Sequence, residues 1–285
     1  MFQLIDGSLI AQKLQSELKS KIQNIESERR RKPYLSVILV GDNPASKIYV
    51  QNKQKACEAV GIHSLTLHKS AEITEGELSH LIEQLNEDPM VDGILLQLPL
   101  PSHIDSFKIL SKIDPLKDVD GLTPYNQGLL TMNKPCHIPC TPSGIIKMLE
   151  FINFKFQGSL AAVLGRSLLV GSPVAKLLSH HNATVINIHS KTKSPWELTK
   201  QADLLIAAVG SPKLVDAKWI KEGAVVIDVG IHRIDNKLCG DVNFDAVKEK
   251  TSWITPVPKG VGPMTIACLL INCYNAYSMK LGFEN

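Results

Sequence analysis

The sequence predicts an α/β protein of two domains, with a parallel sheet in the first. The chain has 285 residues, which is enough for two modest domains with their own cores. Short β-rich apolar runs alternate with helical stretches along most of its length, as in parallel sheets covered by helices. Residues 99–142 are rich in proline and turn residues, and such a segment typically separates domains.

The first series of elements predicts a βαβαβ unit. "SLIAQKLQSELKSKIQNIESE" carries apolar residues at helical spacing and opens the series. The helix that follows the first strand has Pro44 near its first turn and Gly61 just past its end, both typical of helix boundaries. The strands are expected at 34–41, 63–69 and 91–101, and the two helices between them at 43–61 and 74–88.

A second α/β series follows the proline-rich segment. "PSGIIKMLEFI" predicts a helix that leads into it, and the last helix is expected at 263–282. Further strands are expected at 158–167, 183–190, 203–210, 224–230 and 252–258, with a helix at 170–181. We find no repeat of fixed period, so a repeat architecture is not indicated.

Composition and charge exclude several classes of function. The net charge of +3 and the lack of a basic run interleaved with aromatic residues give no sign of a nucleic-acid surface. No apolar run reaches the roughly 18 residues of a membrane span, and "MFQLIDGSLIAQKL" lacks the order of a signal peptide. We therefore expect no membrane contact and a cytoplasmic location.

The six cysteines are scattered, which fits free thiols in a reducing compartment. "CHIPC" brings Cys136, His137 and Cys140 close together in sequence. No second pair of ligands follows at the usual spacing, so we expect no metal site.

A glycine turn in the second series is a candidate dinucleotide site. Gly165 ends a strand and Gly171 begins a helix, with the spacing G-x-S-x-x-x-G in place of the usual G-x-G-x-x-G. A simple packing turn remains the alternative. The next strand ends in "NIHSKT", which has Ser190 and Lys191 but no carboxylate for a ribose hydroxyl. With Arg166 in the turn, these donors suit a 2′-phosphate and favour NADP over NAD, unless they are merely exposed charges.

Tyr49 and Lys53 are four residues apart on a predicted helix and share one face. The pair is either catalytic or part of an ordinary amphipathic helix, and on its own the second reading is favoured. Short-chain dehydrogenases use a Y-x-x-x-K pair that follows the nucleotide-binding glycines. Here the pair precedes Gly165 and lies in the other predicted domain, which argues against that class.

Seven segments, in order, resemble the bifunctional methylenetetrahydrofolate dehydrogenase/cyclohydrolase (FolD) family over essentially the whole chain. They are "VGDNPASKIYVQNKQKACEAVGI", "DGILLQLPLP", "DPLKDVDGLT", "PCTPSG", "LGRSLLVGSPVAKLL", "ATVINIHSKT" and "TPVPKGVGPMTIACLL". The resemblance implies oxidation of 5,10-methylenetetrahydrofolate with NADP+ and hydrolysis of the methenyl product to 10-formyltetrahydrofolate. This is one-carbon metabolism, which feeds purine biosynthesis.

The resemblance also implies an architecture and a partner. We expect a folate-binding catalytic domain at 1–138, completed by a C-terminal helix at 263–285 that packs back on it. A Rossmann-like NADP-binding domain is expected at 139–262. The family is typically a homodimer that associates through the nucleotide domain, and it binds folate in a cleft between domains.

The catalytic residues that the resemblance implies all lie in the first domain. Lys53 matches the catalytic lysine, Tyr49 the tyrosine that stacks on the folate rings, and Gln97 the glutamine that hydrogen-bonds the lysine. Asp120 matches the aspartate that holds the pterin N–H donors, since a carboxylate accepts two parallel bonds. Without the resemblance, Gln97 would be a strand-end residue and Asp120 a turn residue.

Further residues match cofactor and substrate contacts of the family. The NADP contacts are expected at Gly165, Arg166, Ser167, Ser190 and Ile231, the last mainly through its backbone. Ser46, Gly262 and Pro263 are expected near the folate.

One loop departs from the family pattern, because "PVPKGVGPMT" has Lys259-Gly260 where two glycines are usual. A lysine is disfavoured there if that residue must adopt a positive φ. A dehydrogenase without cyclohydrolase activity and a catalytically silent binding protein are the remaining alternatives. The presence of Lys53, Gln97 and Asp120 argues against both.

Overall fold

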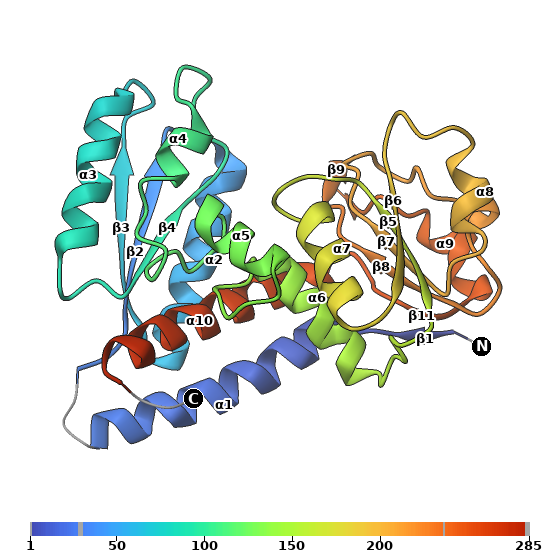
Figure 1. The fold of residues 1–285 in the computed structure, drawn as a ribbon, viewed down its shortest axis with the longest axis horizontal. Helices are drawn as coiled ribbons and strands as arrows, with labels where there is room; N and C mark the ends of the chain where they lie inside the picture. The colour runs from blue at the N-terminus through green and yellow to red at the C-terminus, as the bar shows by residue number, and fades with distance from the viewer. Residues whose placement is uncertain (1, 28–30, 236, 283–285) are drawn as a thin grey trace. The chain divides into compact units, whose positions relative to one another are not determined.

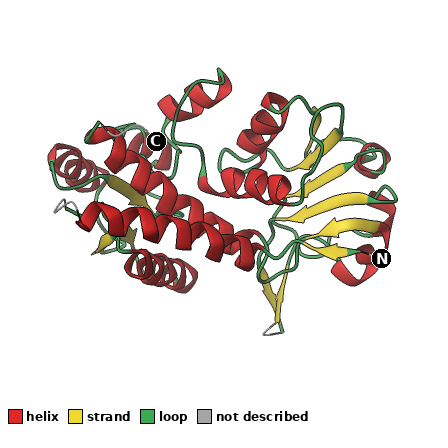
Figure 2. Ribbon diagram, turned by 90° about the horizontal axis from the view of Figure 1, so that it is seen from below, coloured by secondary structure: helices red, strands yellow, loops and turns green. Residues whose placement is uncertain are grey.

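The computed structural model describes residues 2–27, 31–235 and 237–282. The chain divides into two compact units. We call Lys13–Cys140 with Ile266–Asn285 the small-sheet unit, and Met1–Gln12 with Thr141–Thr265 the large-sheet unit. Figure 1 labels the elements, and Figure 2 distinguishes helices from strands.

The small-sheet unit is built on three parallel strands in the order β3-β2-β4. Its elements in chain order are α1 (Gly7–Ser27, from Lys13 on), β2 (Tyr34–Val40), α2 (Pro44–Val60), β3 (His63–Lys69), α3 (Glu75–Glu87), β4 (Gly93–Leu96), α4 (Ser106–Leu110), α5 (Pro124–Thr131) and α10 (Val261–Lys280, from Ile266 on). The predicted βαβαβ series is confirmed, although the third strand ends earlier than expected and two short helices, α4 and α5, lie in the proline-rich segment.

Both faces of the central strand β2 are covered. Leu35, Val37 and Leu39 belong to a core shared with α1, α2 and α10, whereas Ile38 and Val40 belong to a core shared with α3 and α4. This division follows from the strand geometry, because successive side chains point to opposite faces. The predicted packing of the C-terminal helix on the first domain is confirmed.

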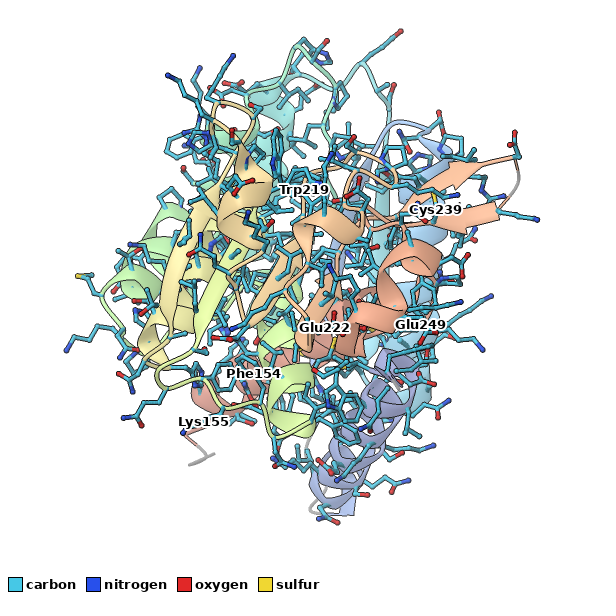
Figure 3. All side chains as sticks on the ribbon, turned by 90° about the vertical axis from the view of Figure 1, so that its right-hand side faces the viewer. Phe154, Lys155, Trp219, Glu222, Cys239 and Glu249 are labelled. Atoms are coloured by element: carbon cyan, nitrogen blue, oxygen red, sulfur yellow. The ribbon has the colours of Figure 1, made fainter. Side chains whose placement is uncertain are left out.

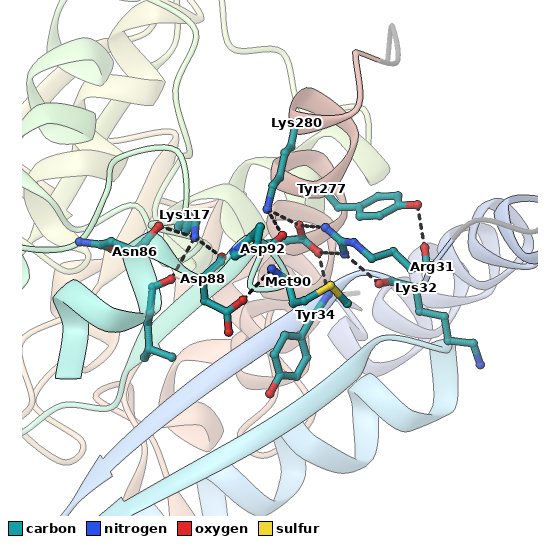
Figure 4. A network of polar contacts seen from close by, with 12 residues as sticks. Arg31, Lys32, Tyr34, Asn86, Asp88, Met90, Asp92, Lys117, Tyr277 and Lys280 are labelled. Atoms are coloured by element: carbon teal, nitrogen blue, oxygen red, sulfur yellow. Dashed lines mark hydrogen bonds and ion pairs between the residues drawn. The ribbon is translucent and has the colours of Figure 1, made fainter.

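A network of polar contacts fixes the last turns of α10 (Figure 4). Arg31 holds the buried carboxylate of Asp92 with two bonds of 2.6 Å, and Lys280 lies 3.6 Å from the same carboxylate. The Tyr277 hydroxyl donates to the Arg31 carbonyl at 2.7 Å. Bidentate bonds of this kind add geometric specificity, so the register of α10 against this unit is set.

The large-sheet unit has six parallel strands in the order β1-β11-β8-β7-β5-β6 and a small antiparallel hairpin, β9–β10. Its elements are β1 (Gln3–Leu4), α6 (Cys140–Phe151), β5 (Leu160–Leu164), α7 (Gly171–His180), β6 (Thr184–Ile188), α8 (Pro195–Thr199), β7 (Leu204–Ala207), η1 (Ala217–Trp219), β8 (Ala224–Asp228), β9 (His232–Ile234), β10 (Lys237–Cys239), α9 (Phe244–Val247), η2 (Lys248–Lys250) and β11 (Thr251–Ile254). This is the expected doubly wound arrangement, and every strand that we predicted in it is present.

The N-terminus differs from the expectation. We placed residues 1–138 in the first domain, whereas Met1–Gln12 belongs to the large-sheet unit. The reason is β1, which pairs in parallel with β11 through Gln3↔Trp253 and Leu4↔Ile254. A strand of two residues gives no periodic signal in the sequence, and the hairpin and the short helices escaped prediction for the same reason. No described helix is both long and apolar enough to cross a bilayer.

Candidate functional site

Helix α2 presents one row of polar side chains. The Asn43 side chain caps its start by accepting from the backbone N–H groups of Ala45 and Ser46. Residues three to four positions apart share a face, so Ser46, Tyr49 and Lys53 lie in one row. Ser46 and Lys53 are 5% and 8% exposed, whereas Tyr49 is 37% exposed and burial raises the pKa of its phenol.

Lys53 is paired with Gln97, which directly follows β4. The Lys53 ammonium donates to Gln97 Oε1 at 3.0 Å. The amide nitrogen of the same glutamine donates to the Leu98 carbonyl at 2.7 Å, and its backbone N–H donates to Ile38. The side chain is therefore held with its oxygen toward the lysine, and a buried ammonium has a fixed, uncharged acceptor.

Asp120 is near enough to this pair for the charge of Lys53 to act on its carboxyl. Burial raises the pKa of its carboxyl, and the nearby Asp118 raises it further. The positive charge of Lys53 and the thiol of Cys140 act in the opposite direction, because they favour the ionised form. The structure thus brings Lys53, Gln97 and Asp120 together from three separate segments of the small-sheet unit.

Cys140 is a site neighbour that the sequence analysis considered only as a metal ligand. Its buried Sγ donates to the Val119 carbonyl at 3.4 Å, and the Asp120 carboxylate is near enough to act on the thiol. Burial raises the pKa of this thiol, and the Asp120 charge adds to the effect. His137 uses its ring nitrogen on the Leu116 carbonyl at 3.1 Å. Among the described residues no three metal-ligating side chains gather.

The loop that carries Asp120 is held on both sides. Lys117 is 8% exposed, and its ammonium donates to three backbone carbonyls at the C-terminal end of α3, at 2.6–2.9 Å (Figure 4). Asp118 accepts from the backbone of Leu122 and Thr123 and from the Asn126 side chain. Asp118 therefore has a structural role at the start of α5.

The glycine turn after β5 forms a tight backbone cradle in the large-sheet unit. Gly165 has φ of +106°, and a Cβ on it would lie 2.1 Å from the Ala208 carbonyl oxygen. A Cβ on Gly171 would lie 2.3 Å from the Gly165 carbonyl oxygen. Both positions require glycine, and the turn brings the backbone to the start of α7, where the positive end of the helix dipole suits a phosphate.

The donors around this turn are open to solvent. Arg166, Ser190 and Lys191 are all exposed. They follow β5 and β6, whose last residues Leu164 and Ile188 are partners in the sheet, so they share one edge of it. Ser167 is also exposed, but its oxygen already accepts from the backbone N–H groups of Val170 and Gly171 at 3.2 and 3.4 Å.

The remaining predicted residues gather at the carboxyl end of β8. A Cβ on Gly262 would lie 3.6 Å from Cδ1 of Ile231, so these two positions are neighbours, with Pro263 next in the chain. Lys259 has φ of +80°, so the condition under which a lysine is disfavoured there is met. Its carbonyl accepts from Ser8, and Gly260 packs on Gly7.

Two buried carboxylates support the loops at this end of the sheet. Asp241 accepts from three successive backbone N–H groups, Val209 to Ser211, and contacts a ring nitrogen of His232 at 2.7 Å. Asp228 accepts from Gly230, Asp241 and Val242. Burial nevertheless raises the pKa of Asp228 to about 6.

A surface pocket of about 580 Å³ lies elsewhere on the large-sheet unit. It is lined by Phe154 and Lys155, which precede β5, and by Glu222, which precedes β8 (Figure 3). These are the amino ends of the strands. Nucleotides bind at the carboxyl ends, so this pocket is not the candidate cofactor site.

Comparison with known proteins agrees with this arrangement. Residues 5–120 match the model of the tetrahydrofolate dehydrogenase/cyclohydrolase catalytic domain, and residues 139–281 match that of its NAD(P)-binding domain. The bifunctional protein FolD of Agathobacter rectalis is 52% identical over 277 residues, which are 97% of this chain and 99% of that protein.

Solved structures extend the comparison. The FolD dehydrogenase/cyclohydrolase of Campylobacter jejuni is 46% identical and superposes with a TM-score of 0.96, covering 98% of this chain and 99% of that one. The Trypanosoma brucei enzyme, solved with NADP cofactor and inhibitor, is 37% identical with a TM-score of 0.95 over 98% of each chain. The chain described here belongs to the tetrahydrofolate dehydrogenase/cyclohydrolase family.

Proposed function

We propose that this protein oxidises 5,10-methylenetetrahydrofolate with NADP+ and hydrolyses the methenyl product to 10-formyltetrahydrofolate. The observation that carries the proposal is the buried Lys53–Gln97 pair beside Asp120. A lysine that contacts a neutral amide and adjoins a carboxylate is placed for proton transfer rather than for a surface ion pair.

The residues of the large-sheet unit fit NADP. Gly165 and Gly171 keep the turn tight, because a Cβ on either would collide with neighbouring backbone, and a tight glycine turn lets the backbone approach a pyrophosphate closely. Arg166 and Lys191 offer exposed cations at the edge of the sheet where the adenosine ribose would lie, and a guanidinium pairs well with phosphate oxygens. When bound, NADP+ supplies the hydride acceptor.

The residues of the small-sheet unit bind and orient the folate. Tyr49 offers a partly exposed ring as a stacking surface for the pterin and aminobenzoyl rings. The Asp120 carboxylate accepts from the amino group and a ring N–H of the pterin. Ser46 lies one turn before Tyr49 on the same face and lines the same region.

Lys53 acts in the second reaction. Water adds to the methenyl carbon, and Lys53 assists the transfer of its proton as the ring opens by cleavage of the bond between that carbon and N5. Gln97 holds the lysine amine in position throughout. Loss of the hydride makes the methenyl carbon electrophilic, so the product of the first reaction is the substrate of the second.

We further propose a homodimer that associates through the large-sheet unit, and a role in the one-carbon metabolism that supplies purine biosynthesis. All six cysteines are free thiols, which supports a reducing compartment such as the cytoplasm. Light scattering of the purified protein measures the oligomeric state directly.

The experiment that tests the function follows NADPH and the methenyl intermediate during turnover of methylenetetrahydrofolate. Wild-type protein should form NADPH with little accumulation of methenyltetrahydrofolate. Lys53→Met should abolish hydration of added methenyltetrahydrofolate, whereas some dehydrogenation survives. Hydration at the wild-type rate by Lys53→Met would disprove the role of the lysine, and no NADPH from wild type would disprove the function.

A further inference from the structure

Asn272 lies in the middle of α10, in the largely apolar stretch "IACLLINCYNAY", which also contains Asn275. Its side chain is 7% exposed. Both bonds of its amide nitrogen go to backbone carbonyls of other segments, to Val119 at 2.9 Å and to Ile138 at 2.9 Å. The same nitrogen lies 3.8 Å from Cys140 Sγ. The last helix therefore reaches two loops at once with one side chain.

The two loops that Asn272 joins are pressed together beside the candidate site. Gly121 has φ of +69°, and a Cβ on it would lie 2.5 Å from the His137 carbonyl oxygen and 2.7 Å from the Pro139 nitrogen. The Val119 carbonyl belongs to the peptide group that leads into Asp120. A bond to that carbonyl therefore fixes the peptide plane from which the Asp120 side chain begins.

We propose that Asn272 is a positioning residue for folate binding, which it serves by fixing the backbone of Asp120. This inference rests on the function proposed above. Asn272 contacts no part of the site that would touch a substrate. It acts through the Val119 peptide, and through Ile138 it holds the neighbouring segment that carries Cys140.

The physical requirement for an amide at this position is clear. An asparagine amide nitrogen has two hydrogens for two acceptors, and the two carbonyls are 2.9 Å away in each case. Aspartate has the same shape but no donor when ionised. In Asn272→Asp, negative carboxylate oxygens would therefore lie against the same two carbonyl oxygens and repel them. The loop that carries Asp120 would then shift away from α10.

The test compares Asn272→Asp with Tyr277→Phe on the same helix. Tyr277→Phe removes the bond to the Arg31 carbonyl, which weakens the attachment of α10 without touching the Asp120 loop. Asn272→Leu is a second variant, because it also lacks the donors but brings no new charge. For each protein we would measure thermal unfolding and the KM values for methylenetetrahydrofolate and NADP+.

A positioning role predicts that Asn272→Asp and Asn272→Leu raise the KM for folate by about tenfold, which corresponds to the loss of one well-placed interaction. The KM for NADP+ should stay within about twofold of the wild-type value, and Tyr277→Phe should change neither. If the Asn272 variants lower the melting temperature as Tyr277→Phe does but leave the folate KM unchanged, the residue is merely structural and the inference is wrong.

Failure of the underlying function gives a different result. If the wild-type protein itself does not turn over methylenetetrahydrofolate, the proposed function fails. If wild type is active and the folate KM of the variants is unchanged, only the assignment of Asn272 fails. Should Asn272→Asp not fold, Asn272→Leu decides the question alone.

Discussion

Replacement of Gly165 by alanine tests whether the nucleotide turn needs glycine because a Cβ would collide with backbone or only because of its positive φ. Two glycines flank β5, and both have a positive φ, +82° at Gly158 and +106° at Gly165. Nothing lies within 4 Å of a Cβ built on Gly158, whereas a Cβ on Gly165 would lie 2.1 Å from the Ala208 carbonyl oxygen. Gly158→Ala is therefore a matched control for strain without collision.

The expected magnitudes follow from this difference. An alanine at positive φ costs about 1–2 kcal/mol, and this should be the whole effect of Gly158→Ala. A forced collision with backbone adds about 1–3 kcal/mol, so Gly165→Ala should lose about 2–5 kcal/mol. Ala208 follows β7, so relief of the collision must move the edge of the sheet on which NADP is proposed to bind.

The assay combines scanning calorimetry with titration of NADP+ into each variant. Gly165→Ala should bind NADP+ at least about tenfold more weakly than wild type, whereas Gly158→Ala should bind it with wild-type affinity. If the two alanine variants lose the same stability and bind NADP+ equally well, the turn is a simple packing turn and our reasoning about the cradle is refuted.

Three further predictions concern charge and strain. Burial raises the pKa of Asp228 in the folded protein to about 6 from 3.8, so its contribution to stability is present below pH about 4 and is lost as the pH rises through 6. The effect is about 3 kcal/mol. The difference in unfolding free energy between wild type and Asp228→Asn should therefore shift by this amount between pH 4 and 7, and a constant difference would contradict the prediction. Lys259→Gly should raise stability by about 0.5–1 kcal/mol, since it relieves the positive φ, whereas Lys259→Ala should give no such gain in the same denaturant titration. Arg166→Ala should weaken NADP+ far more than NAD+ in kinetic assays, and an equal loss for both would show that Arg166 does not contact the 2′-phosphate.

The large-scale fold was predictable because its strands and helices are long enough to show their periods. β2 and β8 are almost fully buried and appear in the sequence as mostly apolar runs next to a glycine. β1 was missed because it has two residues, and its partner β11 lies at the other end of the chain. Local pattern carries no information about such a pairing, so the sequence did not indicate that residues 1–12 pack with the large-sheet unit.

The candidate site was only partly predictable. The resemblance supplied residue identities, and Lys53 and Gln97 indeed lie 3.0 Å apart. It did not indicate which residues hold them. Asn272 could have been noticed as an amide in a largely apolar helix, because a buried amide requires partners. Nothing in the sequence shows that those partners are the Val119 and Ile138 carbonyls, since the contacts span more than a hundred positions.

The charges of Lys53 and Asp120 depend on each other, which affects how any variant of the lysine is interpreted. Burial raises the pKa of Asp120, and the Lys53 charge lowers it. Lys53→Met therefore removes a base and also makes the carboxylate harder to ionise. Of these two losses, only the second should recover as the pH rises. Lys53→Arg keeps the charge without a usable base, since arginine remains protonated. Folate binding that survives in Lys53→Arg while hydration is lost would assign the two roles to separate residues.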